Sequence, residues 1–319
     1  MQIAENVGAS SDPALVTKHN KLDEPTDVFR GSEARRAGLV TKGRLRGTAF
    51  RRLFQDVYVR ADVPVTHELR CRGAALIVPK EAVLTGRSAA TVRGVQLAQP
   101  NDPVEFVVPE KHRFGPVDGI HVRRTAITRR ESRPWNGIRI ARPPRIALDL
   151  MLRLSPRKRG WVRRLRIAVP DIDAFLRSGL VRRGALARSL LKRRNRGIRL
   201  ARYALSLADP RAESMPESEL RVVLVIGGFK PVPQHKVHRK RRFLARLDLA
   251  LVEAKVGIEY DGRWHLNPDQ RIRDRERRRR VTDEGWTFVI VDADLLASDY
   301  QAILNAVSEA ERRNSEPGT

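Results

Sequence analysis

Apolar and polar residues alternate most regularly in the last third of the chain, over residues 244–261. The large apolar residues that recur at every second position are Leu247, Leu249 and Leu251, and then Val256, Ile258 and Tyr260. Successive side chains of a strand point to opposite faces of the sheet, so this spacing predicts strands at 244–252 and 255–261. Each strand should present one apolar face, shared by its three apolar residues, and one polar face that carries Arg246, Asp248 and Ala250 in the first strand.

The two strands are close enough in sequence to form a hairpin. With the turn at residues 253–254, Leu249 pairs with Ile258 and Asp248 lies directly opposite Glu259. A shift of one residue would place Asp248 against the apolar row, so the hydrophobic pattern selects this register.

A pair of opposed carboxylates repels and destabilises a sheet unless a cation lies between the two groups. Mg²⁺ prefers carboxylate oxygens and keeps bound waters, one of which can attack a phosphodiester. The alternative is that Arg246 or another nearby arginine neutralises the pair as an ordinary ion pair. His265, in the loop after the second strand, is close enough to move a proton or to bind the metal water.

The elements around this hairpin complete a small α/β unit over residues 211–312. They are a helix at 216–226, a break at Gly227–Gly228, a strand near 234–238, a basic helix at 268–284, a strand at 286–292 and a helix at 294–312. The last residues, 313–319, are expected to be a flexible tail.

Residues 12–60 have the pattern of a winged helix-turn-helix, after a disordered tail at 1–11. The expected helices are 12–22, 31–37 and 42–46, and the wing is a strand pair at 50–54 and 57–60, joined by a turn at Gln55 and Asp56. The third helix carries Lys42, Arg44 and Arg46 and would enter the major groove of DNA. The alternative is a small helical domain with a solvated basic face.

Residues 61–210 form a basic α+β middle region, with strands expected at 104–108, 120–124 and 138–141. From Met151 to Pro210 there are 17 Lys or Arg against 3 Asp, a net charge of +14. Clusters such as Lys192–Arg193–Arg194 are either the solvated faces of ordinary helices or an uncompensated field that attracts phosphate. Phosphate contacts supply affinity without sequence choice.

The amino-acid composition further restricts the classes of molecule that this protein is expected to bind. The 319 residues include 63 Lys or Arg and 37 Asp or Glu, a formal charge of +26, so polyanions are the expected partner. The longest apolar run, 222–226, is far shorter than a membrane span, and the polar first 25 residues show no export signal, which predicts a cytoplasmic protein that avoids membranes. The single cysteine, Cys71, excludes an internal disulfide and is expected in the core.

Several segments of the last third together resemble one nuclease family. These segments are Glu217–Ser218, Leu220–Arg221, Pro233–Gln234, Leu247–Ala250, Lys255–Gly262 with His265, Asp274, Arg277 and Gly285–Trp286. They are similar to the domain related to the very-short-patch mismatch repair endonucleases, within the PD-(D/E)XK superfamily. The similarity spans about a hundred residues.

The upstream segments resemble a second architecture. Gly38–Leu39, Asp56–Val59, Leu84–Gly86, Ser88–Ala90 and Ala147–Asp149 look like AbiEi-type antitoxins, whose architecture often precedes this nuclease-like domain. This resemblance implies a transcriptional regulator or antitoxin with a possible cognate toxin as partner.

The nuclease resemblance implies a Mg²⁺-dependent (or Mn²⁺-dependent) phosphodiesterase site with Asp248 and Glu259 as metal ligands. The candidate catalytic residues are Glu217, Gln234, Asp248, Glu259, Asp261 and His265. The candidate DNA-binding residues are Lys42, Arg44, Arg46, Arg193, Arg194, Arg273 and Arg277. One departure matters, because Asp261 stands where the superfamily's Glu-x-Lys motif has its lysine. Lys255 lies four residues before Glu259, about 13 Å along a strand, too far to substitute; Arg273, Arg277 or His265 is expected to supply the missing charge.

Three functions therefore remain open at this point. The first is a metal-dependent DNA endonuclease, and the second is an AbiEi-like antitoxin or regulator that uses an inactive nuclease fold to bind DNA. The third is an RNA-binding protein, which the aromatic content of 5% disfavours, because unpaired bases stack on aromatic side chains.

Overall fold

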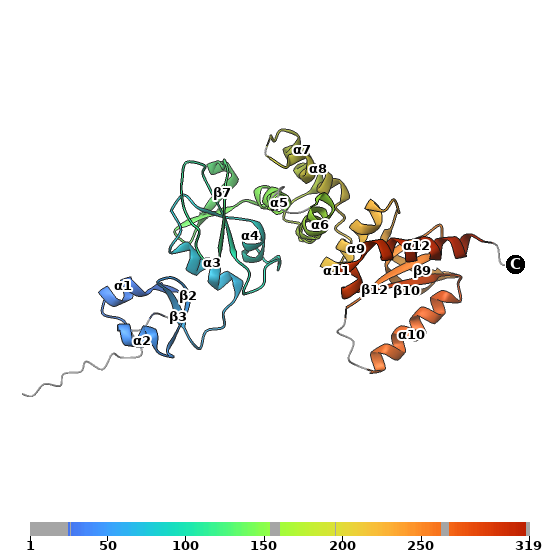
Figure 1. Cartoon of the computed structure of the whole chain (residues 1–319), viewed down its shortest axis with the longest axis horizontal. Helices are drawn as coiled ribbons and strands as arrows, with labels where there is room; N and C mark the ends of the chain where they lie inside the picture. Colours follow the sequence, from blue (N-terminus) through green and yellow to red (C-terminus); the bar gives the residue numbers. More distant parts are fainter. Residues whose placement is uncertain (1–24, 26, 154–159, 195, 263–267, 317–319) are drawn as a thin grey trace, which may run out of the picture. The chain divides into compact units, whose positions relative to one another are not determined.

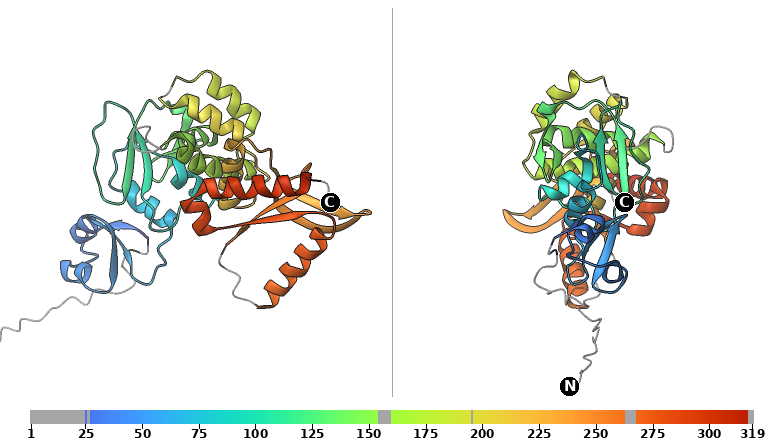
Figure 2. Two further views of the ribbon diagram at one scale, coloured as in Figure 1. Left: turned by 45° about the vertical axis from the view of Figure 1, so that its right-hand side comes forward. Right: turned by 90° about the vertical axis from the view of Figure 1, so that its left-hand side faces the viewer.

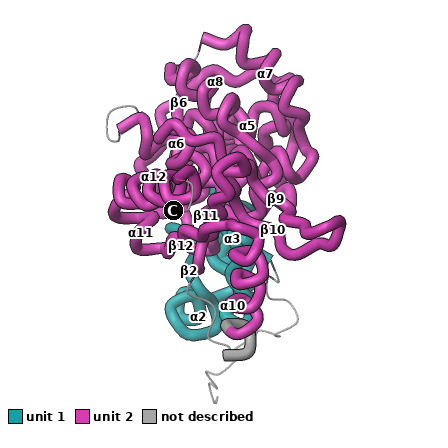
Figure 3. Tube along the Cα trace, turned by 90° about the vertical axis from the view of Figure 1, so that its right-hand side faces the viewer, with its two compact units in different colours: residues 1–78 teal, residues 79–319 magenta. Residues whose placement is uncertain are grey.

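The structure, a computed structural model, describes residue 25 and residues 27–153, 160–194, 196–262 and 268–316; for residues 268–271 it describes the backbone alone. Within these residues helices and strands are both abundant, and the strands form sheets of three, five and four strands (Figure 1). The predicted α/β class is therefore confirmed. The chain divides into two compact units, residues 1–78 and 79–319 (Figure 3).

The first unit contains two short helices followed by a strand pair. Its elements are β1 (Phe29–Arg30), α1 (Gly31–Arg36), α2 (Lys42–Arg46), β2 (Phe50–Phe54), β3 (Val57–Arg60) and α3 (His67–Ala75). The strands are antiparallel in the order β1-β3-β2. The second and third predicted helices and both strands of the wing therefore lie where the pattern places them. The predicted helix at 12–22 lies outside the described residues.

Local hydrogen bonds explain why these short elements form. The Thr41 side chain accepts a hydrogen bond from the Arg44 N–H at 3.2 Å, which caps α2. Asp56, in the turn between β2 and β3, has a φ of 60°. Its carboxylate accepts hydrogen bonds from the Ser32 N–H at 2.8 Å and the Ser32 hydroxyl at 2.6 Å. The turn of the wing is thereby joined to the start of α1.

Helix α3 extends the first unit beyond residue 60, where the sequence pattern ends the winged helix. A Cβ atom on Gly73 would lie 3.2 Å from Val57 and 3.6 Å from Phe54, so α3 packs closely on β2 and β3. Cys71 on the same helix is fully buried, which confirms its expected place in the core.

The second unit begins with a five-stranded sheet in the order β6-β5-β4-β8-β7. Its elements are β4 (Val83–Leu84), α4 (Gly86–Val92), β5 (Val104–Val108), β6 (Ile120–Arg124), a 3₁₀ turn at Arg129–Glu131, β7 (Ser132–Trp135), β8 (Ile138–Ala141) and α5 (Pro143–Leu152). The three strands that the sequence predicts are β5, β6 and β8. It misses β4, which has only two residues, and β7, which contains Pro134.

Three helices follow the sheet: α6 (Trp161–Arg177), α7 (Arg183–Leu191) and α8 (Ile198–Leu207). Two ion pairs join α6 to α9 (Met215–Ile226), one between Asp173 and Arg221 at 2.7 Å and one between Arg166 and Glu219 at 2.8 Å. Residues 79–319 form one compact unit, and these contacts lie within it. The domain boundary expected at 210 therefore does not coincide with a break between units.

The C-terminal part of the unit has a four-stranded sheet in the order β12-β11-β10-β9. Its further elements are β9 (Val232–Arg239), β10 (Arg242–Leu251), β11 (Val256–Asp261), α10 (Pro268–Thr282), β12 (Thr287–Asp292), α11 (Ala293–Ser298) and α12 (Tyr300–Ser315). Strands β11 and β12 are parallel, and β10 is antiparallel to β9 and β11. The predicted last helix is divided in two at Asp299, whose side chain accepts from the Ala302 N–H and caps α12.

The hairpin register is the predicted one, but the facing of its side chains differs. Leu249 pairs with Ile258 and Leu251 with Val256. These residues belong to a core with α9 and α12, whereas Leu247 packs with Ala245, Val237 and Val281 of α10. The prediction that all three leucines share a face is therefore wrong for Leu247. Helices α10 and α12 lie on opposite sides of the sheet (Figures 1 and 2), and the facing changes at Asp248.

Candidate functional site

The backbone is irregular where Asp248 stands in β10. Regular pairing with β11 covers residues 249–251 and stops before Asp248, and pairing with β9 omits Asp248 and Gln234. Gln234 has a φ of 55°, a backbone conformation that residues other than glycine rarely adopt. The Asp248 carboxylate accepts a hydrogen bond from the Tyr260 N–H at 3.1 Å. The Asp248 carboxylate therefore contacts the backbone of β11. The regular alternation of apolar side chains along β10 is interrupted at this residue.

Glu217 reaches the same place from the first turn of α9. Ser214 caps that helix by accepting from the Glu217 N–H at 3.2 Å, and the Glu217 carboxylate accepts from the Glu213 N–H at 3.0 Å. The partial positive charge of a helix N-terminus stabilises a carboxylate there. The Gln234 side chain donates to Glu217 from Nε2 at 2.8 Å. Two of the candidate catalytic residues that the nuclease resemblance implies are therefore in direct contact.

The Gln234 amide has an acceptor without a partner. Its nitrogen donates to Glu217, so its Oε1 atom points elsewhere, is buried and has no hydrogen-bond partner among the described residues. Reversing the amide would bring two oxygens together, so the contact with Glu217 sets this orientation. A buried carbonyl oxygen without a donor is costly, and a donor or a cation would relieve the cost.

The electrostatics of Asp248 reflect this crowding. Burial raises the pKa of Asp248 to about 6, and the charges of Glu217 and Glu259 raise it as well. The Tyr260 N–H and the positive charge of Arg277 oppose this rise. Two further acidic groups therefore act on Asp248, and a raised pKa from burial and like charge is typical of functional sites.

Glu259 is the most buried of these acids and is held by two arginines of α10. Its side chain is 5% exposed. Arg277 donates to its Oε1 at 2.8 Å and to its Oε2 at 3.0 Å, and Arg278 donates to Oε2 at 3.0 Å. The arginine pairing that the sequence leaves as an alternative to a metal is thus present on Glu259. No arginine donates to Asp248 among the described contacts.

The other residues expected near the site are placed as follows. Asp261 ends β11, beside Asp292 of β12 in the parallel register. His265 lies outside the described residues. Lys255 donates to the Glu284 carbonyl at 3.0 Å, at the far end of β11 from the site. Of the three groups expected to replace the missing lysine, Arg277 reaches the acidic cluster, and Arg273 is exposed on the same helix.

The oxygen atoms of this site are of the kind that a hard divalent cation prefers. They do not by themselves fill the coordination sphere of such an ion. Within residues 25–316, gaps excepted, no three His, Cys, Asp or Glu side chains are grouped as metal ligands. The carboxylates of Glu217 and Asp248 and the unpartnered Gln234 oxygen are oxygen donors, which Mg²⁺ and Mn²⁺ prefer. Glu259 does not belong to this set in the structure, because its two oxygens are paired with Arg277 and Arg278.

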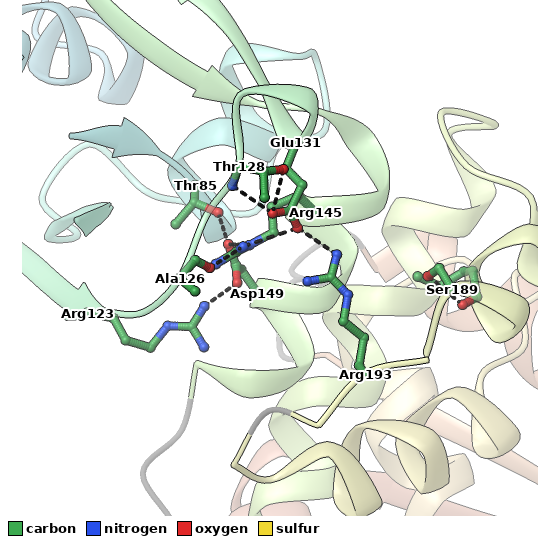
Figure 4. A network of polar contacts seen from close by, with 10 residues as sticks. Thr85, Arg123, Ala126, Thr128, Glu131, Arg145, Asp149, Ser189 and Arg193 are labelled. Atoms are coloured by element: carbon green, nitrogen blue, oxygen red, sulfur yellow. Dashed lines mark hydrogen bonds and ion pairs between the residues drawn. The ribbon is translucent and has the colours of Figure 1, made fainter. Parts of the chain in front are cut away.

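The predicted DNA-binding residues lie on several elements and differ in exposure. On α2, Lys42 and Arg46 are exposed, while Arg44 is partly buried with its guanidinium 6.0 Å from the Phe50 ring. On the segment after α7, Arg194 is exposed. Arg193 differs, because it pairs with Glu131 at 2.5 Å (Figure 4). The charge of Arg193 is therefore balanced by Glu131 within the protein.

Glu131 belongs to a polar network that ties α5 to the five-stranded sheet (Figure 4). Arg145, 1% exposed, contacts Glu131 at 3.2 Å and Asp149 at 2.9 Å. Thr85 donates to Asp149 at 2.5 Å. Thr85 and Asp149 belong to the segments that resemble antitoxins, and in this structure they form part of the core.

Comparison with known proteins finds two partial relatives. They are proteins of Mycobacterium tuberculosis, strains CDC 1551 and H37Rv, both named only as uncharacterized, and each is 36% identical over 131 residues. The match covers 40% of this chain, and the chain spans about half the length of these curated relatives. No family model matches the chain. No solved structure matches it.

Some features of the site cannot be recognised from the sequence alone. Arg278 is one of four consecutive arginines, and nothing in that run indicates which of them face Glu259. The hydrogen bond from Tyr260 to Asp248 involves the backbone, which carries no residue-type signal. No helix in the described parts of the chain is long and apolar enough to cross a bilayer.

Proposed function

We propose that this protein binds duplex DNA and hydrolyses its phosphodiester bonds with a divalent cation, Mg²⁺ or Mn²⁺, at the acidic site of β10, β11 and α9. The observation that carries the proposal is the meeting of Glu217, Gln234 and Asp248 beside Glu259, with a buried amide oxygen that has no partner among the described residues. A carboxylate whose pKa is raised by burial and by neighbouring negative charge, as that of Asp248 is, is costly to a fold, which favours a role in chemistry over a role in stability.

In this proposal Asp248 and Glu259 hold the cation, as the resemblance implies, and Gln234 and Glu217 complete the site. The cation would polarise the phosphate and lower the pKa of a bound water, which is the general contribution of a metal to hydrolysis. Arg277 and Arg278 supply the positive charge that the absent lysine would supply. Arginine recognises phosphate in the same two-pronged geometry in which Arg277 now holds Glu259.

The arginine pairs imply an exchange of partners during binding. Arg277 and Arg278 pair with both oxygens of Glu259 in the protein alone, which offsets part of the repulsion between Glu259 and Asp248. A DNA phosphate offers these arginines a second acceptor, and Glu259 is then available to a cation. Replacement of Arg278 by Gln should therefore tighten Mn²⁺ binding in the absence of DNA, measured by calorimetric titration against an Arg279→Gln control. Equal affinities for the two variants would contradict the exchange.

A second candidate function follows from the same contacts. An AbiEi-like regulator or antitoxin, with a cognate toxin as a possible partner, would need the fold and the basic surface but no metal. Glu259 with both oxygens held by arginine is compatible with a permanent structural ion pair. Such a protein would bind DNA equally well with and without a divalent cation.

Plasmid cleavage separates the two functions. Purified protein would be incubated with supercoiled plasmid and Mg²⁺ or Mn²⁺, beside Asp248→Asn and Glu259→Gln variants. Asp283→Asn, an equal charge change at an exposed position after α10, is the matched control. Nicking by the wild type and the control, with at least a hundredfold loss in both site variants, supports the nuclease. Cleavage that persists in all variants points to a contaminant, and no cleavage with either metal favours the regulator.

A further inference from the structure

A basic β-arm extends from the C-terminal sheet. We define it as residues 235–246, the ends of β9 and β10 with the turn between them. It contains six Lys or Arg and no Asp or Glu. Strand β11 pairs with β10 only at residues 249–251, whereas β9 and β10 remain paired as far as Arg239 and Arg242. The arm is therefore a two-stranded ribbon beyond the edge of β11, and Figure 2 shows this hairpin reaching past the neighbouring elements.

The turn of the arm has an unfavourable backbone for its residues. Lys240 and Arg241 have φ values of 44° and 72°. Two successive positive φ angles are typical of the type I′ turn, which favours Asn-Gly. Lysine and arginine are poor choices for this conformation, so the turn carries its two charges at a cost in local stability. Both side chains are exposed at the tip.

One face of the arm combines charge with an exposed aromatic ring. Lys236 pairs with Arg246 and His238 with Phe243, so these four side chains share a face. Phe243 is 54% exposed, and its ring lies 5.9 Å from that of His238. The opposite face carries Val237 and Ala245, which are buried against α10. The arm is thus fixed on one side and open on the other.

We infer that the basic β-arm binds in the major groove of duplex DNA. A two-stranded antiparallel ribbon has the width that this groove admits. The charges of Lys240 and Arg241 at the tip and of Lys236 on the open face would contact phosphates on both walls, whereas Arg246 is already paired with Glu213 at 2.8 Å. Phe243 would pack against apolar groups of the base edges. The inference rests on the proposed function for its choice of DNA as partner, but it requires neither the metal nor cleavage.

A double substitution in the turn tests the charge of the basic β-arm without destabilising its hairpin. Lys240→Asn with Arg241→Gly removes two charges and installs the turn sequence that type I′ geometry prefers, so the hairpin should be at least as stable. Lys80→Gln with Lys111→Gln removes two exposed charges elsewhere in the same unit and is the matched control. Binding of a 25-base-pair duplex would be measured by fluorescence anisotropy in EDTA, at several salt concentrations.

The arm variant should bind at least tenfold more weakly than the wild type at 0.15 M salt, with an unchanged or higher melting temperature. Its slope of log affinity against log salt should fall by about 2, because each phosphate contact contributes about 0.9. The control should lose less than threefold. Equal losses in the two variants would overturn the inference, because net charge alone would then explain the effect.

Two further measurements sharpen the test. Phe243→Ala should weaken binding severalfold without changing the salt slope, because it removes an apolar contact and no charge. Duplex RNA has a major groove that is too narrow for a two-stranded ribbon. The arm variant and the control should therefore bind duplex RNA with equal affinity. A selective loss of RNA binding in the arm variant would contradict insertion into a DNA groove.

The two proposals fail in different ways. If Asp248→Asn cleaves like the wild type, the nuclease proposal fails while the metal-free binding data remain valid for the arm. If the arm variant binds normally in EDTA while Asp248→Asn abolishes cleavage, the arm inference fails and the nuclease stands.

Discussion

Asp248 has the clearest electrostatic cost to stability among the residues of the candidate site. Its pKa of about 6 in the folded protein is above the value of an unfolded chain, about 3.9. The folded state therefore binds the proton more tightly, and stability falls as pH rises from about 4 to about 6. At neutral pH the ionised, buried carboxylate destabilises the fold.

Replacing Asp248 by Asn should relieve this cost. Asn keeps an oxygen for the Tyr260 N–H and has no charge to bury, so in EDTA at pH 7.5 the variant should gain on the order of 2 kcal/mol. The gain should vanish below about pH 4. Urea unfolding at both pH values measures it. A variant that is less stable at pH 7.5 would show that the ionised carboxylate is well compensated.

Glu131 shows the opposite behaviour. Burial would raise its pKa, but hydrogen bonds from Arg193 and the Thr128 N–H, with the charge of Arg145, outweigh burial and hold the pKa at about 2. Its folded pKa lies below the unfolded value, so its stabilisation is present above about pH 4.3 and is lost as pH falls toward 2.

Glu131→Gln should therefore destabilise the protein by about 2 kcal/mol at pH 7, because buried Arg145 loses a charged partner. The difference from the wild type should shrink as the pH is lowered from 4.5 toward 2.5. Glu316→Gln, at an exposed position, is the control and should change little. Denaturant titrations across this pH range measure both, and a constant difference would exclude the proposed linkage.

Among the elements, the junction of β4 and α4 depends most clearly on a glycine. Gly86 has a φ of 57°, and a Cβ atom there would lie 1.7 Å from the Glu105 carboxylate. That carboxylate is buried and is held by Arg153 at 2.7 Å and by the Arg87 N–H at 3.1 Å. It cannot move aside without breaking these contacts.

Gly86→Ala should cost about 3 kcal/mol or more, the sum of the left-handed backbone penalty and the displaced ion pair. Gly94 provides a matched comparison, because its φ is 86° and nothing lies within 4 Å of the position that a Cβ atom would take there. Gly94→Ala should cost only the backbone penalty, about 1–2 kcal/mol. Equal losses in chemical unfolding would mean that Glu105 adapts freely.

For the whole molecule the dominant property is its charge of +26. Binding to DNA should release condensed counterions, so affinity should fall steeply with salt. If six or more phosphates are neutralised, the affinity for a 25-base-pair duplex should fall about a thousandfold between 50 and 200 mM salt. Anisotropy titrations in EDTA measure this slope. A nearly flat dependence would contradict a surface that binds phosphates.

The linear pattern of the chain was enough to predict the α/β class, the wing at β2 and β3, and the register of β10 on β11. These features depend on contacts between residues near in sequence and on an alternation that tolerates only one pairing. The predicted register also brought Asp248 and Glu259 together as candidates, although regular pairing stops before Asp248 and its carboxylate accepts from the Tyr260 N–H instead.

Three-dimensional packing was needed for the rest. Whether an arginine or a cation balances Glu259 depends on how α10 lies on the sheet, and the sequence shows only a run of arginines. The change of facing at Asp248 arises from a backbone irregularity shared with Gln234, which no residue pattern encodes. Arg193 is drawn into an ion pair with Glu131, 62 residues away, because long-range contacts form only when the elements pack.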